Sequence, residues 1–203
     1  MAGADVRSEG VLRAGVRRLH PAYFALVMAT GIVSVAAHLL GMELVAQALV
    51  AVNLAAFPLL WVLTLTRVVL YPSDVFEDLV DHQRGVGFFT IVAGTSVLGV
   101  QLVLVRGDRV AGFALWTVAV ALWLLLTYAI FTAFTVKETK PSLAEGINGG
   151  WLVAVVATES VSNLGGLLLP AFKDHHEELL FFTLVFWLCG GMLYIWMISL
   201  IFY

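Results

Sequence analysis

Six long apolar stretches alternate with short polar connectors along the chain. About 20 helical residues cross the hydrocarbon core of a bilayer, so an apolar run of 18 or more residues predicts a transmembrane helix. Each stretch here has 18 to 27 residues. We therefore predict an all-α, polytopic membrane protein with six transmembrane helices, at Tyr23–Leu40, Leu44–Thr66, Gly85–Val105, Val110–Val136, Gly149–Leu169 and Leu179–Tyr203.

The basic residues are divided unequally between the two ends of these helices. The N-terminal tail and the connectors after the second and fourth stretches carry eight of the 11 Lys and Arg residues. Because cytoplasmic loops carry an excess of Lys and Arg, this division places the N-terminus in the cytoplasm. We expect residues 1–20 to be a cytoplasmic N-terminal segment, with a short interfacial helix, and residues 21–203 to form the transmembrane domain of a multi-pass protein of the inner (plasma) membrane.

Composition narrows the functional classes. Hydrophobic residues make up 61% of the 203 residues and charged residues 12%, with a net charge of −3. Soluble domains have about 45–50% apolar and about 25% charged residues. These values exclude a soluble enzyme, a nucleic-acid-binding protein and a disordered chain. One cysteine, Cys189, excludes an intrachain disulfide, and we expect it to pack as a small apolar residue.

A short motif of small and hydroxyl residues recurs in the odd-numbered stretches. Thr30, Thr95 and Thr158 lie at the centres of three such motifs, spaced 65 and 63 residues apart. The even-numbered stretches carry a tryptophan among bulky apolar residues instead. A repeat at a fixed period indicates an array of equivalent units, and one unit here has the length of a helical hairpin.

This repeat predicts three hairpins with the odd-numbered helices inside and the even-numbered helices outside. Glycines and hydroxyls that face inward either let helices approach closely or line a wet cavity. Helices that are apolar on all sides can face lipid. The motifs therefore serve helix packing or a central pathway, and three similar clusters at similar depth favour the pathway.

Catalytic chemistry is poorly supported. Intramembrane serine proteolysis and bis-histidine haem binding both need histidines inside the spans, and the five histidines lie in connectors or, for His38, at a helix end. His175 and His176 precede two glutamates, but adjacent residues do not face one another on a helix. We interpret 174–178 as a loop and an acidic helix start rather than a metal site. We expect no metal, no cofactor and no enzymatic activity.

Glu159 is the one ionisable residue near the middle of a predicted span. A charged residue at the bilayer centre costs about 2.5–3.5 kcal/mol, so Glu159 is expected to face inward. An intramembrane carboxylate marks either a functional site or a hydrogen bond between helices, here with Thr158, Ser160, Ser162 or Asn163 in reach.

The fifth stretch begins with a glycine-rich turn. Asn148 is a candidate N-cap, and Gly149 and Gly150 allow a tight approach. A helix N-terminus carries partial positive charge and free N–H groups, which suit an anion. Asn148, Gly149 and Gly150 are therefore a candidate anion site at a helix start.

Four segments resemble the tellurite-resistance/C4-dicarboxylate transporter family, which includes slow-type anion channels and malic acid transporters, and bacterial members most of all. The segments are RLHPAYFALVMATGIVS at 18–34, FFT with VAGT at 88–95, EGINGGWL with VVATES at 145–160, and GGMLY with SLIFY at 190–203. The resemblance implies ten helices in five hairpins, a pore surrounded by odd-numbered helices, homotrimers, and anionic substrates such as C4-dicarboxylates and tellurite-related oxyanions.

Two features depart from this family pattern. Position 159 is expected to be Gln, and a glutamate there places a negative charge in an anion path. The chain also has three hairpins where the family has five, so the later odd helix with the pore-occluding phenylalanine has no counterpart and we assign no gate. The sequence corresponds to the N-terminal six helices of such a protein.

We therefore predict transport of small anions through a pathway lined by the odd-numbered helices. An alternative is a non-transporting membrane subunit or a truncated fragment that packs against a partner. Four further spans in the reading frame downstream of Tyr203 would favour the transporter. In addition to the helix-start site, we predict residues that line the pathway and would hydrogen-bond and desolvate an anion. These candidate pathway residues are Thr30, Ser34, Thr95, Ser96, Thr158, Glu159 and Ser162.

Overall fold

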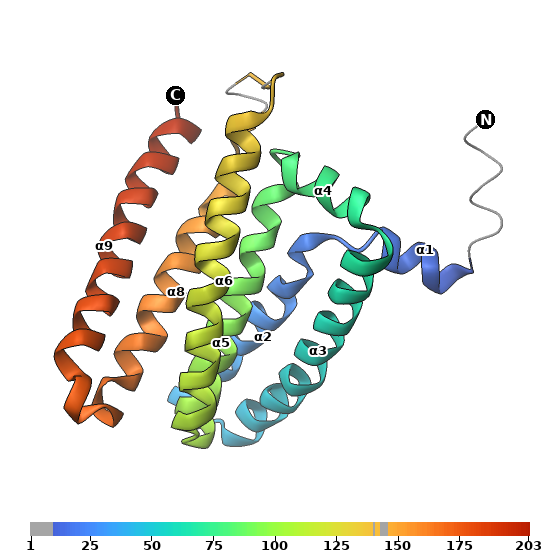
Figure 1. Cartoon of the computed structure of the whole chain (residues 1–203). Helices are drawn as coiled ribbons and strands as arrows, with labels where there is room; N and C mark the ends of the chain where they lie inside the picture. The colour runs from blue at the N-terminus through green and yellow to red at the C-terminus, as the bar shows by residue number, and fades with distance from the viewer. Residues whose placement is uncertain (1–9, 140, 143–145) are drawn as a thin grey trace.

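The computed structural model describes residues 10–139, 141–142 and 146–203 (Figure 1). The regular secondary structure of these residues is helical, with no strand among them. The α-helices are α1 (Val11–Arg17), α2 (Ala25–Leu39), α3 (Glu43–Leu70), α4 (Pro72–Val80), α5 (Phe89–Arg106), α6 (Arg109–Val136), α8 (Leu152–Leu168) and α9 (His176–Ile201). Short 3₁₀ turns are η2 (Pro21–Phe24), η3 (Gly85–Phe88), η4 (Gly149–Trp151), η5 (Leu169–Ala171) and η6 (Lys173–His175).

The six predicted spans are confirmed within the described residues. Helical segments long and apolar enough to cross a membrane are Pro21–Leu39, Glu43–Leu70, Gly85–Arg106, Arg109–Val136, Gly149–Ala171 and Lys173–Ile201. The sixth begins six residues before the predicted Leu179, because it includes η6 and the first turn of α9, which contains Glu177 and Glu178. Acidic residues interrupt an apolar pattern, but they stabilise a helix N-terminus.

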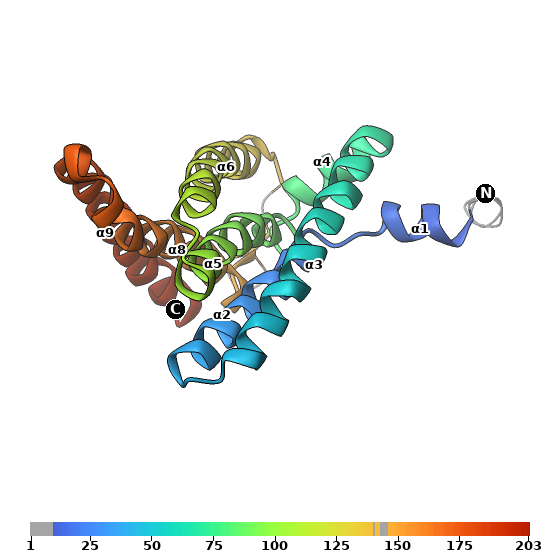
Figure 2. The ribbon, with the colours of Figure 1, turned by 90° about the horizontal axis from the view of Figure 1, so that it is seen from below.

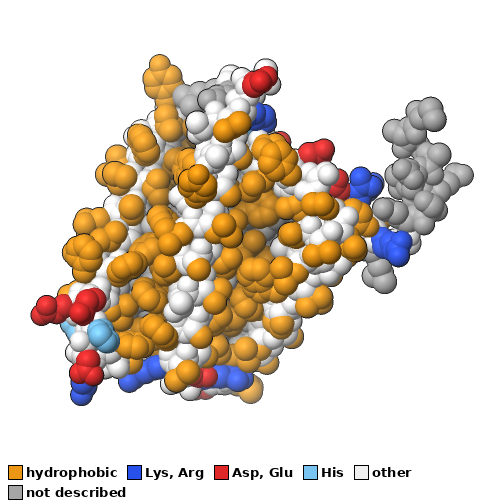
Figure 3. Space-filling view, viewed as in Figure 1, with side chains coloured by type: hydrophobic (Ala, Val, Ile, Leu, Met, Phe, Trp, Pro, Cys, Tyr) orange, Lys and Arg blue, Asp and Glu red, His pale blue; other side chains and the backbone are white. Residues whose placement is uncertain are grey.

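The helices have the expected inner and outer arrangement. The span that contains α5 is 78% buried and that of α8 is 50% buried, whereas those of α3, α6 and α9 are only 11–17% buried. The span of α2, which is 28% buried, lies between these two groups. Seen from below, α5 lies centrally, with α3, α6 and α9 towards the outside (Figure 2). In Figure 3, hydrophobic side chains cover the middle of the visible face and charged side chains gather towards its two ends, as a membrane-spanning bundle requires.

Close packing and indole hydrogen bonds join the inner and outer layers. The Nε1 of Trp123 on α6 donates to Thr158 Oγ1 at 2.8 Å, and the Nε1 of Trp116 donates to the carbonyl oxygen of Val161 at 3.0 Å. Both acceptors lie on α8. Gly112 on α6 is buried where an added Cβ would collide with Val103 of α5. Small residues at such contacts let helix backbones approach.

Gly99 offers a direct test of this packing. It lies on α5, where a Cβ atom would collide with Leu164 of α8 and lie 3.5 Å from Leu115 Cβ. We expect Gly99→Val to lower the free energy of unfolding, measured by SDS titration in detergent micelles, by about 1–3 kcal/mol through overpacking. The matched control is Gly191→Val on α9, which has open space around it and should change stability little. Equal losses for both variants would contradict this packing.

Candidate functional site

An open groove of about 680 Å³ lies along the inner helices. Ile32 and Val35 of α2 line it, together with Val97 and Val100 of α5. The α8 helix lines the other side, and Trp187 of α9 closes one edge. The three odd-numbered spans therefore share one surface.

The polar part of this groove comes from a single face of α8. Glu159, Ser160 and Asn163 are spaced i, i+1 and i+4, so the helical period places them together. Ser160 Oγ donates to the carbonyl oxygen of Ala157 at 2.8 Å. Ser162 also lines the groove, but its Oγ donates to the carbonyl oxygen of Thr183 on α9 at 2.9 Å. The groove thus combines apolar walls with a carboxylate, a hydroxyl and an amide.

Gly190 makes room for the Glu159 side chain. An added Cβ at Gly190 would collide with Glu159 Oε1 and lie 2.7 Å from its Cδ. The carboxylate therefore lies over the bare backbone of α9, between α8 and α9. Sequence reasoning singled out both residues separately, and the structure brings them together.

The other five candidate pathway residues do not line the groove. Ser34 is buried and donates to the carbonyl oxygen of Ala46 on α3 at 2.8 Å. Thr95 and Thr158 donate to carbonyl oxygens four residues earlier on their own helices. Ser96 is buried with no hydrogen-bond partner within the described part of the chain, and Thr30 is half-buried on α2. These positions match the packing alternative, and a role for them in an anion path stays a prediction.

The glycine-rich start of the fifth span is capped as predicted. Asn148 Oδ1 accepts from the backbone N–H of Gly150 at 2.8 Å, and Trp151 Nε1 donates to the carbonyl oxygen of Gly146. Gly149 and Gly150 are exposed and do not line the groove. The Gly150 N–H is thus already paired in this structure, and anion binding at Asn148, Gly149 and Gly150 stays a prediction.

A buried amide pair behind the groove was not singled out from the sequence. Asn53 of α3 and Gln101 of α5 are fully buried. Asn53 Nδ2 donates to Gln101 Oε1 and to the carbonyl oxygen of Val27, both at 2.9 Å. The pair joins α2, α3 and α5 beside Gly31. The signal present in the sequence was two amide side chains inside otherwise apolar runs.

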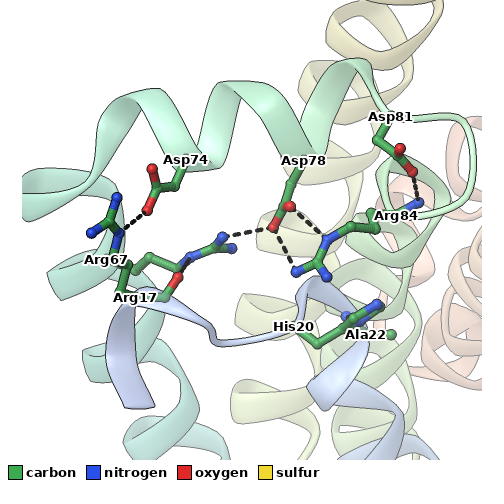
Figure 4. A network of polar contacts seen from close by, with 8 residues as sticks. All are labelled: Arg17, His20, Ala22, Arg67, Asp74, Asp78, Asp81 and Arg84. Carbon is green, nitrogen blue, oxygen red and sulfur yellow. Dashed lines mark hydrogen bonds and ion pairs between the residues drawn. The ribbon is translucent and has the colours of Figure 1, made fainter. Parts of the chain in front are cut away.

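A second polar group missed by sequence reasoning lies where α3 ends and α5 begins (Figure 4). We call it the Asp78 cluster; its residues are Arg17, Arg67, Asp74, Asp78 and Arg84. Asp78 on α4 pairs with Arg67 at 2.7 Å and with Arg84 at 2.5 Å. Arg17 pairs with Asp74 at 2.6 Å, and its carbonyl oxygen accepts from Arg67 Nε at 2.9 Å. The cluster therefore ties α1, α3, α4 and the start of the third span together.

The described residues contain no group of three or more His, Cys, Asp or Glu side chains that could hold a metal ion. His175 and His176 lie in η6 and at the first position of α9, next to Glu177 and Glu178. This arrangement agrees with a loop and an acidic helix start.

Comparison with known proteins identifies the family. The sulfite efflux pump SSU1 of Arthroderma otae is 24% identical over 93% of the chain and 52% of its own length. The corresponding pump of Trichophyton rubrum is 23% identical, with the same coverage. An uncharacterized transporter of Methanocaldococcus jannaschii is 25% identical over 93% of the chain and 55% of its own length. The chain thus spans about half the length of these curated relatives.

No solved structure matches the chain. The family model described as SLAC1, voltage-dependent anion channel, matches residues 18–203, which include all six spans and every groove-lining residue. The chain therefore belongs to the SLAC1 family of anion channels and transporters, the group that the four sequence segments resemble.

Proposed function

We propose that this multi-pass membrane protein moves small anions along the groove between α2, α5 and α8. The groove itself is the observation that carries the proposal, because it joins the faces of all three odd-numbered spans. Its polar edge can hydrogen-bond an anion while its valine and isoleucine walls remove water. In a channel or transporter of this kind no covalent chemistry is needed, and we propose no enzymatic activity.

Glu159, Ser160, Ser162 and Asn163 are the side chains that we propose meet the anion. The amide of Asn163 donates hydrogen bonds to an oxyanion, and the hydroxyls of Ser160 and Ser162 do so when they turn away from the carbonyl oxygens to which they donate here. A carboxylate in its ionised form repels an anion. Glu159 therefore tunes the passage of anions rather than binding them. Its position over Gly190 moves the carboxylate towards α9, which leaves the α2 and α5 side of the groove without this charge.

The proposed substrates are small oxyanions. Two relatives are named as sulfite efflux pumps, which supports sulfite, and the sequence resemblance supports C4-dicarboxylates. We further propose a plasma-membrane protein with a cytoplasmic N-terminus that assembles as a homotrimer. The positive-inside distribution of Lys and Arg supports the orientation, and the family resemblance supports the assembly.

Narrowing the groove tests the pathway. Val97 lies on α5 at the groove wall, so Val97→Trp should reduce anion efflux severalfold by filling the space. The assay uses protein from the complete reading frame in liposomes loaded with sulfite, succinate or chloride. The matched control is Leu124→Trp on the exposed side of α6, which should leave efflux unchanged.

Both variants must be shown to insert at wild-type levels. Efflux that survives Val97→Trp at the wild-type rate would contradict the groove as the pathway. Absence of efflux of all three anions from wild-type liposomes would favour the alternative of a non-transporting subunit.

A further inference from the structure

His20 lies in the linker between α1 and the first span. Its Nδ1 accepts a hydrogen bond from the backbone N–H of Ala22 at 3.1 Å and so caps η2, which leads directly into α2. A ring nitrogen that accepts a hydrogen bond carries no proton, so this arrangement requires a neutral imidazole with its proton on Nε2.

The charges around His20 come from three elements. Arg67 of α3, Asp78 of α4 and Arg84 of the turn before η3 all act on it (Figure 4). Asp78 already pairs with both arginines, so two positive charges share one carboxylate. Burial and the Arg84 guanidinium lower the pKa of His20 below its usual value, with a smaller contribution from Arg67, and Asp78 opposes them.

A small cavity of about 20 Å³ lies beside His20, with Thr64 and Arg67 also in its wall. This is about the volume that one water molecule needs. The rest of the wall is apolar, made of Leu, Pro, Val, Phe and Ile side chains. His20 therefore borders a small void next to Arg67 of the Asp78 cluster.

The turn that His20 caps packs directly on the start of α5. Thr90 Oγ1 donates to the carbonyl oxygen of Gly87 at 2.7 Å and also lies 3.2 Å from the carbonyl oxygen of Pro21. A Cβ at Gly87 would lie 3.1 Å from the Ala22 nitrogen, so the two backbones are in close contact. Because α2 and α5 both line the groove, the turn that His20 caps lies at the ends of two groove helices.

We propose that His20 is a proton-responsive hinge, whose protonation releases α1 and the Pro21–Ala22 turn from α3 and α4. A proton on Nδ1 removes the acceptor for Ala22 N–H and adds a third positive charge beside Arg67 and Arg84. Since the closed arrangement favours the neutral imidazole, its stability is fully present above about pH 6.5, the ordinary value for histidine, and falls as the pH drops towards the lowered pKa. The segment is closed at neutral pH and opens in acid.

Spin labels on α1 and α4 measure this opening. With the single cysteine changed by Cys189→Ser, labels are attached at Arg13→Cys and Ser73→Cys, both exposed positions. We expect one short distance at pH 8 and its replacement by longer distances as the pH is lowered to 5, with a midpoint below about 6.5. An unchanged distance between pH 8 and pH 5 would overturn the hinge.

Substitutions assign the effect to His20. His20→Asn keeps a side-chain acceptor for the cap but does not titrate, so it should stay closed at both pH values. His20→Ala lacks the acceptor and should be open already at pH 8. The control is His176→Asn, which changes an exposed histidine at the start of α9. This variant should show the same pH dependence of the distance as the wild type.

A wild-type pH response in His20→Asn would also overturn the proposal, and this variant suffices if His20→Ala does not fold. The distance measurement requires no transport. Its failure would therefore remove the hinge and leave the proposed anion pathway as it stands.

Discussion

Replacing Asp78 by alanine is expected to lower the free energy of unfolding by about 3–5 kcal/mol, because the change breaks a buried ion pair and leaves its partner unpaired. Arg67 is 5% exposed and Asp78 is 7% exposed, so water cannot replace the lost carboxylate easily. Arg84 loses the same partner and then lies near Arg67 without an intervening negative charge. The measurement is SDS titration of the purified protein in detergent micelles.

Asp74→Ala is the matched control for this prediction. Asp74 is on the same helix and also pairs with an arginine, but its partner Arg17 has a side chain that is 49% exposed. Exposed pairs contribute about 0–1 kcal/mol, so Asp74→Ala should have a small effect. Similar losses for the two variants would show that Asp78 acts as a surface residue and not as the centre of the cluster.

The sequence was sufficient to predict the spans and their layers. Hydrophobic length alone located six helices, because an apolar run of this length has few alternatives to crossing a bilayer. The layer assignment followed from Gly, Ser and Thr in the odd-numbered helices, and α5, with Gly94 and Gly99 in close contacts, is the most buried. The Asn148 cap was also predictable, since an N-cap depends on local sequence.

The roles of the hydroxyls could not be predicted in the same way. A threonine or serine in a helix can donate to the carbonyl four residues earlier or turn towards a neighbour. Thr95 donates to the carbonyl oxygen four residues earlier on its own helix, whereas Ser34 donates to a carbonyl oxygen of α3. Both residues belong to the same repeated motif. Which side faces the groove depends on helix rotation, and weak amphipathicity leaves that rotation undefined in the sequence.

The Asp78 cluster could not be predicted from the sequence for a different reason. Its residues come from separate connectors, and Arg17 and Asp74 pair across 57 positions. The α4 helix has nine residues, too few to stand out against the long spans beside it. Pro72 at its first turn was a local signal of a helix start. Only the tertiary structure brings the connectors together around one carboxylate.

Replacing Glu159 by glutamine should raise anion flux about tenfold when the carboxylate is ionised. Two unit charges about 6 Å apart repel by about 1.4 kcal/mol if the effective dielectric constant of a wet groove is about 40, and this energy corresponds to about a tenfold change in anion occupancy. Glutamine keeps the size and hydrogen-bonding groups of glutamate, so the side chain can still lie over Gly190. Flux is measured in the same liposomes, over a range of pH.

The control is Glu177→Gln, an exposed residue in the first turn of α9 that does not line the groove. It makes the same chemical change without altering the charge beside the anion, so flux should stay at the wild-type value. If the proton of Glu159 takes part in transport, the pH dependence of flux should also flatten in Glu159→Gln. An unchanged flux with an unchanged pH profile would mean that the carboxylate lies outside the anion path, and the hydroxyl and amide groups of α8 would then have to carry the selectivity alone.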